Sequence, residues 1–303
     1  MVFIKQKTIN ISSKDSGQRL DKFLSSSLSE LSRSLIQKLV KENLILVNKK
    51  STKSGYKLKK NDEVVVSVPD LKDPEVKAED IPLEVVYEDK DLIVVNKSVG
   101  MVTHPASGHY EGTLVNALLS HCKGSLSGIN GILRPGIVHR LDKETSGLII
   151  ACKNNKSHNE IARQIKSREI KKYYLAIVHG KVKYKEGTIN KPIGRHKVHR
   201  HKMAVVKGGR SAVTRWRVSK DLGKYTLLEL DLETGRTHQI RVHLTSIGYP
   251  VVGDKVYGKK NDTHAQMMLH SYKLIFTHPV TKKKITLETK IPERFNNLLL
   301  NHH

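Results

Sequence analysis

The sequence lacks the features of exported, membrane-spanning and disulfide-stabilised proteins. Its 303 residues contain only two cysteines, Cys122 and Cys152, whose distant positions match no metal-binding or redox motif, so we expect reduced thiols in or near the core. Apolar runs stay well below the roughly 20 residues that a membrane-spanning helix needs, and lipidation motifs are missing. The first residues do not form a secretory signal. We therefore expect a cytoplasmic protein without a membrane partner.

Motifs for common cofactors and metals are also missing. The sequence has no Gly-x-Gly-x-x-Gly, no His-Glu-x-x-His and no pair of carboxylates at metal-binding spacing. Residues 253–259 fit the first seven positions of a phosphate-binding P-loop, but Lys260 occupies the position of the required metal-binding hydroxyl, so we reject this assignment. The sequence therefore predicts neither a metal nor an organic cofactor.

Acidic residues are scarce relative to basic ones. The chain has 54 Lys and Arg against 29 Asp and Glu, which gives a net charge of +25 and an isoelectric point near 9.9. A charge so far from zero indicates a polyanionic partner. Residues 166–224 contain 18 basic and three acidic residues, and residues 1–70 contain 14 and seven. This uneven distribution is typical of binding faces.

Three histidines between residues 196 and 201 leave two alternatives, a metal site or a loop that contacts phosphates. Four cations surround the histidines and would repel a dication, which favours the phosphate-contacting loop. These cations are Arg195, Lys197, Arg200 and Lys202.

The N-terminal third predicts a small α+β domain. We expect a strand at residues 2–4, a helix opening at 19–24, a second helix with Ser32 as its N-cap, and strands at 44–48 and 63–68. From Arg19 to Val68 this order resembles the S4 RNA-binding domain, with Arg33 and Lys49 as candidate RNA contacts; the alternative is a generic basic helical hairpin. The acidic, proline-interrupted residues 71–80 predict a linker, so we expect domains at 1–70 and 81–303.

The remaining chain predicts an α+β fold on a mostly antiparallel sheet. Strands and helices are mixed with short, hairpin-like gaps rather than regular βαβ spacing, which disfavours a doubly wound sheet. Thr113 is a predicted N-cap, and residues 157–160 resemble a capping box at the start of a helix. We expect strands at 85–89, 92–96, 148–151, 172–178, 211–218 and 225–232.

One lone carboxylate has an unusual setting. Residues 139–147 read His-Arg-Leu-Asp-Lys-Glu-Thr-Ser-Gly and precede a short apolar run, so Asp142 should project from a turn that a buried strand holds in place. Its neighbours Arg140 and Lys143 favour the ionised form, which suits a nucleophile or an electrostatic stabiliser. The alternative is a surface turn with a local ion pair. Arg-Leu-Asp-Lys recurs at residues 19–22 without the turn, so Asp21 is expected to be a helix-end charge.

A second segment concentrates cations at a predicted helix start. Thr237 is the expected N-cap, and Arg236, Arg241 and His238 lie at the positive end of the helix dipole, where each cation is disfavoured by roughly 0.3–1 kcal/mol. A carboxylate or phosphate gathered there would explain this clustering. The alternative is that the arginines extend into solvent.

The strand at 172–178 contains Tyr174, next to Lys171 and Lys172. An aromatic ring beside phosphate-binding cations can stack on an unpaired base. The alternative is an ordinary core tyrosine.

Together these segments resemble the RluA-type pseudouridine synthases, and with the S4-like domain they are most similar to the RluD branch, whose members modify large-subunit ribosomal RNA. Residues 139–147 resemble the catalytic-aspartate motif of this family, 172–176 the tyrosine motif and 235–243 the arginine motif. One departure is Ser98, where the family usually has proline.

The resemblance implies isomerisation of uridine to pseudouridine in large-subunit (23S) ribosomal RNA without a cofactor. The oligomeric state is open, and a monomer is the default expectation. Asp142 would be the catalytic carboxylate, which either attacks the ribose or the base or assists by deprotonation. Tyr174 would stack on the uracil, and Arg241 would pair with Asp142. Arg140 would fill the gap that the flipped uridine leaves. The RNA contacts expected beside it are Arg236, His238, Lys172, Arg195, Arg200, Lys202, Arg33 and Lys49.

Two other functions stay open from the sequence. One is a catalytically silent RNA-binding or ribosome-assembly factor, in which Asp142 would affect only stability. The other is an enzyme that acts on a sugar or nucleotide through one carboxylate and binds RNA weakly.

Overall fold

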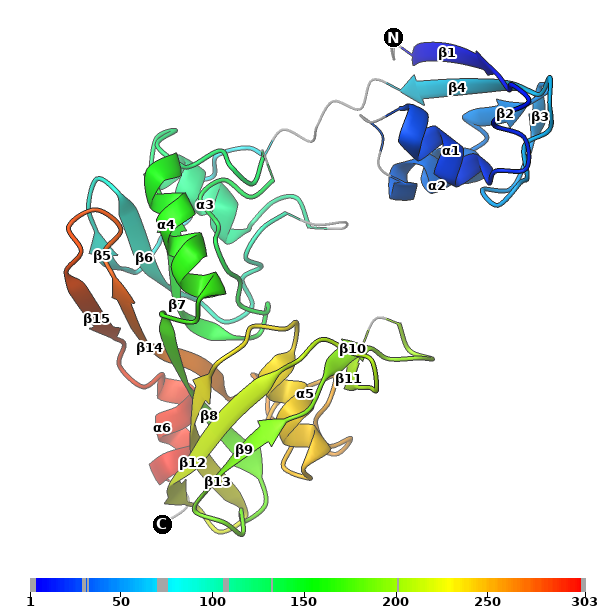
Figure 1. Ribbon diagram of the computed structural model, residues 1–303. Coiled ribbons are helices and arrows are strands. Elements are labelled where there is room, and N and C mark those ends of the chain that lie inside the picture. Colours follow the sequence, from blue (N-terminus) through cyan, green and yellow to red (C-terminus); the bar gives the residue numbers. More distant parts are fainter. Residues whose placement is uncertain are drawn as a thin grey trace. The chain divides into compact units, whose positions relative to one another are not determined.

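The chain forms two compact units, residues 1–74 and 75–303, and each is described by itself. The structure is a computed structural model that describes residues 4–28, 31, 33–69, 76–105, 109–131, 133–200 and 202–300 (Figure 1). None of the described helices is both long and apolar enough to cross a membrane. Both cysteines are free and buried, as expected.

The first unit packs two helices on a four-stranded antiparallel sheet with strand order β1-β4-β2-β3. The apolar residues of both helices and of the inner sheet face form one core. The first strand is longer than predicted, and Ser32, the predicted N-cap, lies outside the described residues. The elements are β1 (Ile4–Asn10), α1 (Leu20–Ser27), α2 (Arg33–Lys41), β2 (Ile45–Val47), β3 (Lys50–Ser51) and β4 (Glu63–Pro69).

The second unit is built on one nine-stranded mixed sheet. Its first half contains β5 (Val85–Glu88), β6 (Leu92–Lys97), α3 (Leu114–His121), β7 (Ser146–Cys152), α4 (Asn155–Lys166), β8 (Lys171–His179) and β9 (Glu186–Asn190). The rest contains β10 (Ile193–Arg195), β11 (Met203–Val205), β12 (Val213–Asp221), β13 (Tyr225–Leu232), α5 (Gln239–Ser246), β14 (Leu269–Thr277), β15 (Lys284–Glu288) and α6 (Glu293–Leu300). Strands β10 and β11 form a separate hairpin.

The strand order of the large sheet is β5-β6-β7-β14-β8-β13-β12-β9, with β15 paired to β14. The β7–β14 pair is parallel and the other pairs are antiparallel. Strand β14 therefore joins two antiparallel groups, β5-β6-β7 and β8-β13-β12-β9, that both precede it in the sequence. This arrangement confirms the predicted α+β fold with a mostly antiparallel sheet.

Side chains alternate between two cores, one on each face of the sheet. In β8, Tyr174 and Ala176 belong to the core that α3 and α5 cover, whereas Leu175 and Ile177 belong to a core that α6 covers. Helix α4 covers the second face beside β6, β7 and β14 through Ile161. The side chain of Tyr174 is thereby directed to the face on which α5 lies.

Helix starts follow the predictions in part. Thr113 is the N-cap of α3 and forms a capping box with Asn116, as expected. The predicted capping box at residues 157–160 is wrong, because the side chain of Asn154 accepts a hydrogen bond from the Ser157 amide and α4 begins at Asn155. The strand before α4 ends at Cys152, so the chain reaches its first good capping residue three positions earlier than the pattern suggested.

Candidate active site

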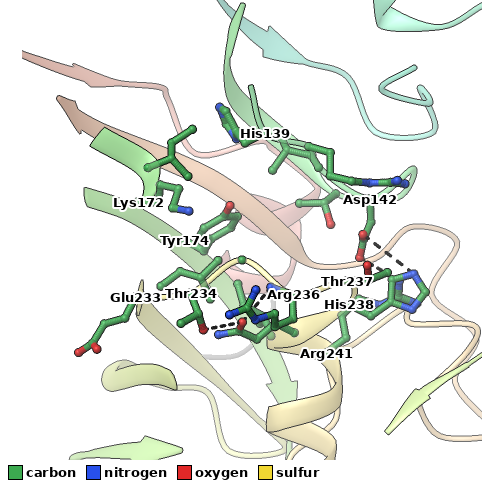
Figure 2. Close-up of a pocket in the computed structure, with 18 of the residues that line it drawn as sticks. His139, Asp142, Lys172, Tyr174, Glu233, Thr234, Arg236, Thr237, His238 and Arg241 are labelled. Atoms are coloured by element: carbon green, nitrogen blue, oxygen red, sulfur yellow. Dashed lines mark hydrogen bonds and ion pairs between the residues drawn. The ribbon is translucent and has the colours of Figure 1, made fainter. Parts of the chain in front are cut away.

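A pocket of about 440 Å³ lies on the face of the sheet that α5 covers. Residues from the 138–145 turn, from α4 and β8, from the 232–241 segment and from the start of β14 line it. Lys172 and Tyr174 lie on one side, and Asp142 and His238 lie on the other (Figure 2). The three sequence motifs thus meet at one cavity.

The turn that carries Asp142 is fixed at both ends. The hydroxyl of Thr103 donates to the Leu141 carbonyl at 2.8 Å, and the Thr145 amide donates to the Asp142 carbonyl at 3.1 Å. Gly147 has φ +114°, and a Cβ there would lie 2.2 Å from the Ser271 carbonyl oxygen on β14. Only glycine allows β7 to approach β14 this closely, so the end of the motif holds the turn against the sheet.

Arg241 is held between two carboxylates. Its Nη1 lies 3.1 Å from Asp142 Oδ2, while Nε and Nη2 donate to Asp254 Oδ2 and Oδ1 at 2.7 and 2.8 Å. The side chains of Arg241 and Asp254 are 6 % and 0 % exposed, against 17 % for Asp142. Burial lowers the pKa of Arg241, but the hydrogen bonds and charge of Asp254 and the charge of Asp142 outweigh it, so the net pKa is raised. The guanidinium is therefore a permanent, oriented cation beside Asp142.

The predicted ion pair between Arg241 and Asp142 is present, but the sequence reasoning missed Asp254. This residue lies in the segment that was considered only as a P-loop. Its Oδ1 also accepts the amides of Val256 and Tyr257, as in a tight turn. A Gly-Asp pair after an apolar stretch was a signal for such a turn, but nothing local assigns Arg241 as its partner.

His238 replaces Thr237 as the N-cap of α5, so the Thr237 prediction is wrong. His238 has a left-handed backbone with φ +55° and makes no side-chain cap. The turn is closed instead by Gln239, whose Oε1 accepts the Arg236 amide at 3.0 Å. The imidazole lies between two groups, with Nδ1 2.8 Å from Tyr257 Oη and Nε2 4.0 Å from Asp142 Oδ1. Burial lowers the pKa of His238, although the charge of Asp142 acts in the opposite direction. The lowered pKa favours the neutral ring.

Lys172 and Tyr174 form the inner wall of the pocket. Their side chains share one face because they are two residues apart on β8, and the residues are 9 % and 5 % exposed. Burial raises the pKa of Tyr174 to about 12. Burial lowers the pKa of Lys172, whose Nζ has no hydrogen-bond or ion-pair partner within the described part of the chain. Lys172, which is predicted as an RNA contact, thus lines the pocket.

Asp142 is the available carboxylate of this pocket. The other acidic residue that lines it is Glu233, whose Oε1 lies 2.5 Å from Arg215 Nη2 and whose Oε2 lies 3.8 Å from Arg168 Nη1. In the described part of the chain, the one ion contact of Asp142 Oδ1 is with His238 Nε2, at 4.0 Å. An unblocked carboxylate oxygen at the pocket can therefore reach a bound group.

The other candidate RNA contacts lie in three places. Arg140 is exposed and lines the pocket. Arg236 also lines the pocket and donates from Nε to the Ser211 carbonyl. Among the described residues, no carboxylate pairs with Arg236. Outside the pocket lining, the β10–β11 hairpin carries Arg195, Arg200 and Lys202, and the first unit carries Arg33 and Lys49.

In the first unit, Asp21 is an organising residue rather than a simple helix-end charge. Its carboxylate is fully buried and accepts hydrogen bonds from Arg19, Arg33 and Gln37. The guanidinium of Arg33 is 2.8 Å from Asp21 Oδ2 and remains 47 % exposed. Lys49 is exposed in the turn between β2 and β3. Two half-exposed arginines thus share one buried carboxylate.

One group of possible metal ligands occurs among the described residues, formed by Asp89, Asp91 and His278. Its oxygens already accept hydrogen bonds. Asp89 Oδ1 accepts the amides of Asp91 and Leu92, and Oδ2 accepts from Tyr87 and His278. This group is a hydrogen-bonded turn away from the pocket lining.

The family model of RNA pseudouridylate synthases matches residues 91–246, about half of the chain, and includes the pocket segments up to α5. The chain belongs to the RluA-type RNA pseudouridine synthases. It is therefore an isomerase, and the S4 domain model matches residues 18–64. Both predicted resemblances are confirmed.

Similar proteins extend over nearly the whole chain. The Bacillus subtilis protein named "Uncharacterized RNA pseudouridine synthase YlyB" is 44 % identical over 300 residues, 98 % of each chain. The Zymomonas mobilis protein named "Ribosomal large subunit pseudouridine synthase D" is 41 % identical over 290 residues, 91 % of each chain. The solved structure of human RNA pseudouridylate synthase domain containing 1 matches with a TM-score of 0.57 and 28 % identity, over 70 % of this chain and 85 % of that one.

Proposed function

We propose that this isomerase converts uridine to pseudouridine in large-subunit ribosomal RNA, with Asp142 as the catalytic carboxylate. The observation that carries the proposal is a single unblocked carboxylate at a basic pocket, held by Arg241 and opposite Tyr174. The name of the relative from Zymomonas mobilis supports the choice of RNA. A ribosomal substrate would also agree with the predicted cytoplasmic location and with a monomer acting on a large RNA.

The reaction is an isomerisation, so its atoms balance within the nucleotide. The bond from N1 of uracil to C1′ of ribose breaks, and a bond from C5 to C1′ forms. C5 loses a proton and N1 gains one. The enzyme must therefore hold the detached base, stabilise the charge that develops and move one proton.

Asp142 can serve this reaction in more than one way. Its free Oδ1 can attack the ribose or the base covalently, or it can assist by removing a proton. In each case Arg241 directs the carboxylate, because Asp254 fixes the guanidinium from the opposite side. The same ion pair serves all these routes.

The uracil base would bind against the inner wall of the pocket, which Lys172 and Tyr174 form. The ring of Tyr174 provides a stacking surface, and its raised pKa keeps the hydroxyl protonated near neutral pH, so it can donate a hydrogen bond or a proton. The buried ammonium of Lys172 lacks an acceptor, and a uracil carbonyl would supply one. When the N1–C1′ bond breaks, the electron pair is shared with the uracil carbonyls, and a donor at this position would stabilise that anion.

The remaining cations are assigned to the RNA around the target. The uridine must leave its helix or loop to enter the pocket, and Arg140 on the pocket lining can occupy the vacated space. The β10–β11 hairpin and the first unit, with Arg33 and Lys49, would contact phosphates.

Mapping pseudouridine in cells tests this function. The gene is deleted and then restored as wild type or as Asp142→Asn, and pseudouridines are mapped in ribosomal and transfer RNA. We expect large-subunit sites to disappear on deletion and to return only with the wild type, while purified Asp142→Asn still binds RNA. Sites restored by Asp142→Asn would refute the catalytic assignment. Loss confined to transfer RNA would refute the substrate and retain the chemistry.

A further inference from the structure

The β10–β11 hairpin is a folded, strongly basic arm. No acidic residue occurs between Glu186 and Asp221. At its tip, His196 Nδ1 accepts the amides of Val198 and His199 at 3.1 Å, and Val198 is 76 % exposed. Arg195 Nη1 donates to the Arg200 carbonyl at 2.9 Å. The tip is thus internally braced and presents cations around an exposed apolar side chain, a surface that fits a phosphodiester backbone.

The hairpin is attached, where β11 begins, to one short segment that follows Asp254. Lys202 Nζ donates to the Val256 carbonyl at 3.1 Å, and the Met203 amide donates to Tyr257 Oη at 2.8 Å. The hairpin therefore meets the candidate active site through Val256 and Tyr257.

Tyr257 contacts both groups that flank Asp142. Its ring lies under the Arg241 guanidinium, 5.0 Å from the centroid, and its amide donates to Asp254 at 3.0 Å. Its hydroxyl oxygen accepts from Met203, so the hydroxyl hydrogen is free to donate to His238 Nδ1 at 2.8 Å.

This hydrogen bond selects one tautomer of His238. With Nδ1 as the acceptor, the neutral ring carries its proton on Nε2. Nε2 lies 4.0 Å from Asp142 Oδ1, on the side of the carboxylate that Arg241 does not contact. A chain of donors thus runs from the Met203 amide through Tyr257 and His238 toward Asp142.

We propose that Tyr257 is a positioning residue that couples the hairpin to the catalytic carboxylate. Docking of the RNA backbone on the hairpin fixes Met203 against Tyr257, and Tyr257 in turn orients His238 and Arg241 around Asp142. The proposal rests on the proposed function, because it takes RNA as the substrate and Asp142 as the catalytic group. It assigns a role in catalysis to a residue that does not line the pocket.

Five full-length proteins test this coupling: wild type, Tyr257→Phe, a hairpin variant with Lys197→Ala and Arg200→Ala, the combination of these changes, and a control. The substrate is ribosomal RNA purified from cells without the gene. RNA affinity and the single-turnover rate at saturating enzyme are measured separately. Tyr257→Phe removes only the hydroxyl and retains the ring over Arg241. Tyr249→Phe is the matched control, since it removes a tyrosine hydroxyl that contacts the Lys183 amide outside the pocket.

We expect Tyr257→Phe to bind RNA within about twofold of wild type and to react roughly tenfold more slowly, the usual effect of one lost hydrogen bond. Tyr249→Phe should react at the wild-type rate. In the hairpin variant, adding Tyr257→Phe should slow the reaction less than threefold or so, because coupled residues are not additive.

Three results would overturn the proposal. A wild-type rate for Tyr257→Phe would exclude positioning through the hydroxyl. An equal slowing in both backgrounds would exclude coupling to the hairpin. An equal slowing by Tyr249→Phe would show a general loss of stability. If the wild type forms no pseudouridine in this RNA, the proposed function fails instead, and that outcome is distinct.

Discussion

Replacing each of the two carboxylates that contact Arg241 should separate the effect on the stability of the fold from the effect on the rate of catalysis. Asp254 and Asp142 bind the same guanidinium. Asp254 is fully buried and makes two of the three contacts with carboxylate oxygens, whereas Asp142 is partly exposed and makes one. Asp254→Asn and Asp142→Asn are therefore a matched pair, with the same chemical change at the same cation.

The structure gives the expected magnitudes. In Asp254→Asn the side-chain oxygen can still accept the Val256 and Tyr257 amides, but the new amide group then faces Arg241 Nε, donor against donor. Removing one partner of a buried ion pair destabilises a fold by about 3–5 kcal/mol. In Asp142→Asn the guanidinium keeps Asp254, so we expect a loss below about 1 kcal/mol, as for partly exposed pairs.

The kinetic effects should follow the opposite order. Asp142→Asn should give no detectable product. Asp254→Asn should react about 100-fold more slowly with unchanged RNA affinity, the effect of a misplacement of about 1 Å in a catalytic group.

Unfolding in urea can follow the second unit alone, because Trp216 is the only tryptophan in the chain and is buried in that unit. Its fluorescence gives the free energy of unfolding for each variant, and single-turnover assays give the rates. Equal stability losses in the two variants, or full activity of Asp254→Asn, would refute the division of roles around Arg241.

Three further predictions concern other parts of the chain. Gly147→Ala should destabilise the second unit by roughly 2–5 kcal/mol through backbone strain and the clash with Ser271. Gly223 has a positive φ and open surroundings, so Gly223→Ala should show only the strain. Equal unfolding curves of the two variants, followed by Trp216 fluorescence, would contradict the clash. The variant with Lys197→Ala and Arg200→Ala should reduce the slope of log affinity against log salt by roughly one to two. RNA titrations at several salt concentrations measure this slope, with Lys283→Ala, Lys284→Ala as the control variant. Equal slopes in both variants would exclude the hairpin as the RNA face. The pKa of Asp21 is lowered, chiefly by its hydrogen bond with Arg19, so its contribution to stability is present above the unfolded pKa of about 4 and is lost as the pH falls below it. In denaturant unfolding, the difference in the free energy of unfolding between wild type and Asp21→Asn should therefore be larger at pH 7 than at pH 3. A constant difference would exclude the ion pairs as its cause.

The sequence alone was most informative where charge conflicted with local structure. Cations at the start of α5 required an anion, and Asp142 in its basic turn required a cation, so their pairing was predictable although 99 positions separate them. Strands β5, β6, β7, β8, β12 and β13 were predicted from apolar runs bounded by turns, whereas the other described strands of the second unit were not predicted. These signals are local, or they arise from unfavourable local electrostatics.

What the sequence could not show depends on tertiary contacts. Asp254 has ordinary turn chemistry in the chain, and only the fold brings it to Arg241. The placement of Lys172 was in part accessible, because a residue two positions from a buried tyrosine on one strand shares its face. From its sequence, Lys172 was instead predicted to be one of the phosphate-binding cations beside Tyr174. Helix starts depended on where the preceding strand ended, so two acceptable capping residues, Asn154 and Ser157, could not be ranked.

The position of β14 has a consequence for synthesis of the chain on the ribosome. Strands β5 to β7 and strands β8, β9, β12 and β13 are made first, but only β14, which begins at Leu269, joins the two groups. Until then β7 and β8 each present an unpaired edge, the type of edge that favours association between chains. Asp142 lies just before β7 in the first group and Tyr174 belongs to the second, so a nascent chain has both residues long before it has an active site. An enzyme of this design can begin to act only after β14 has emerged.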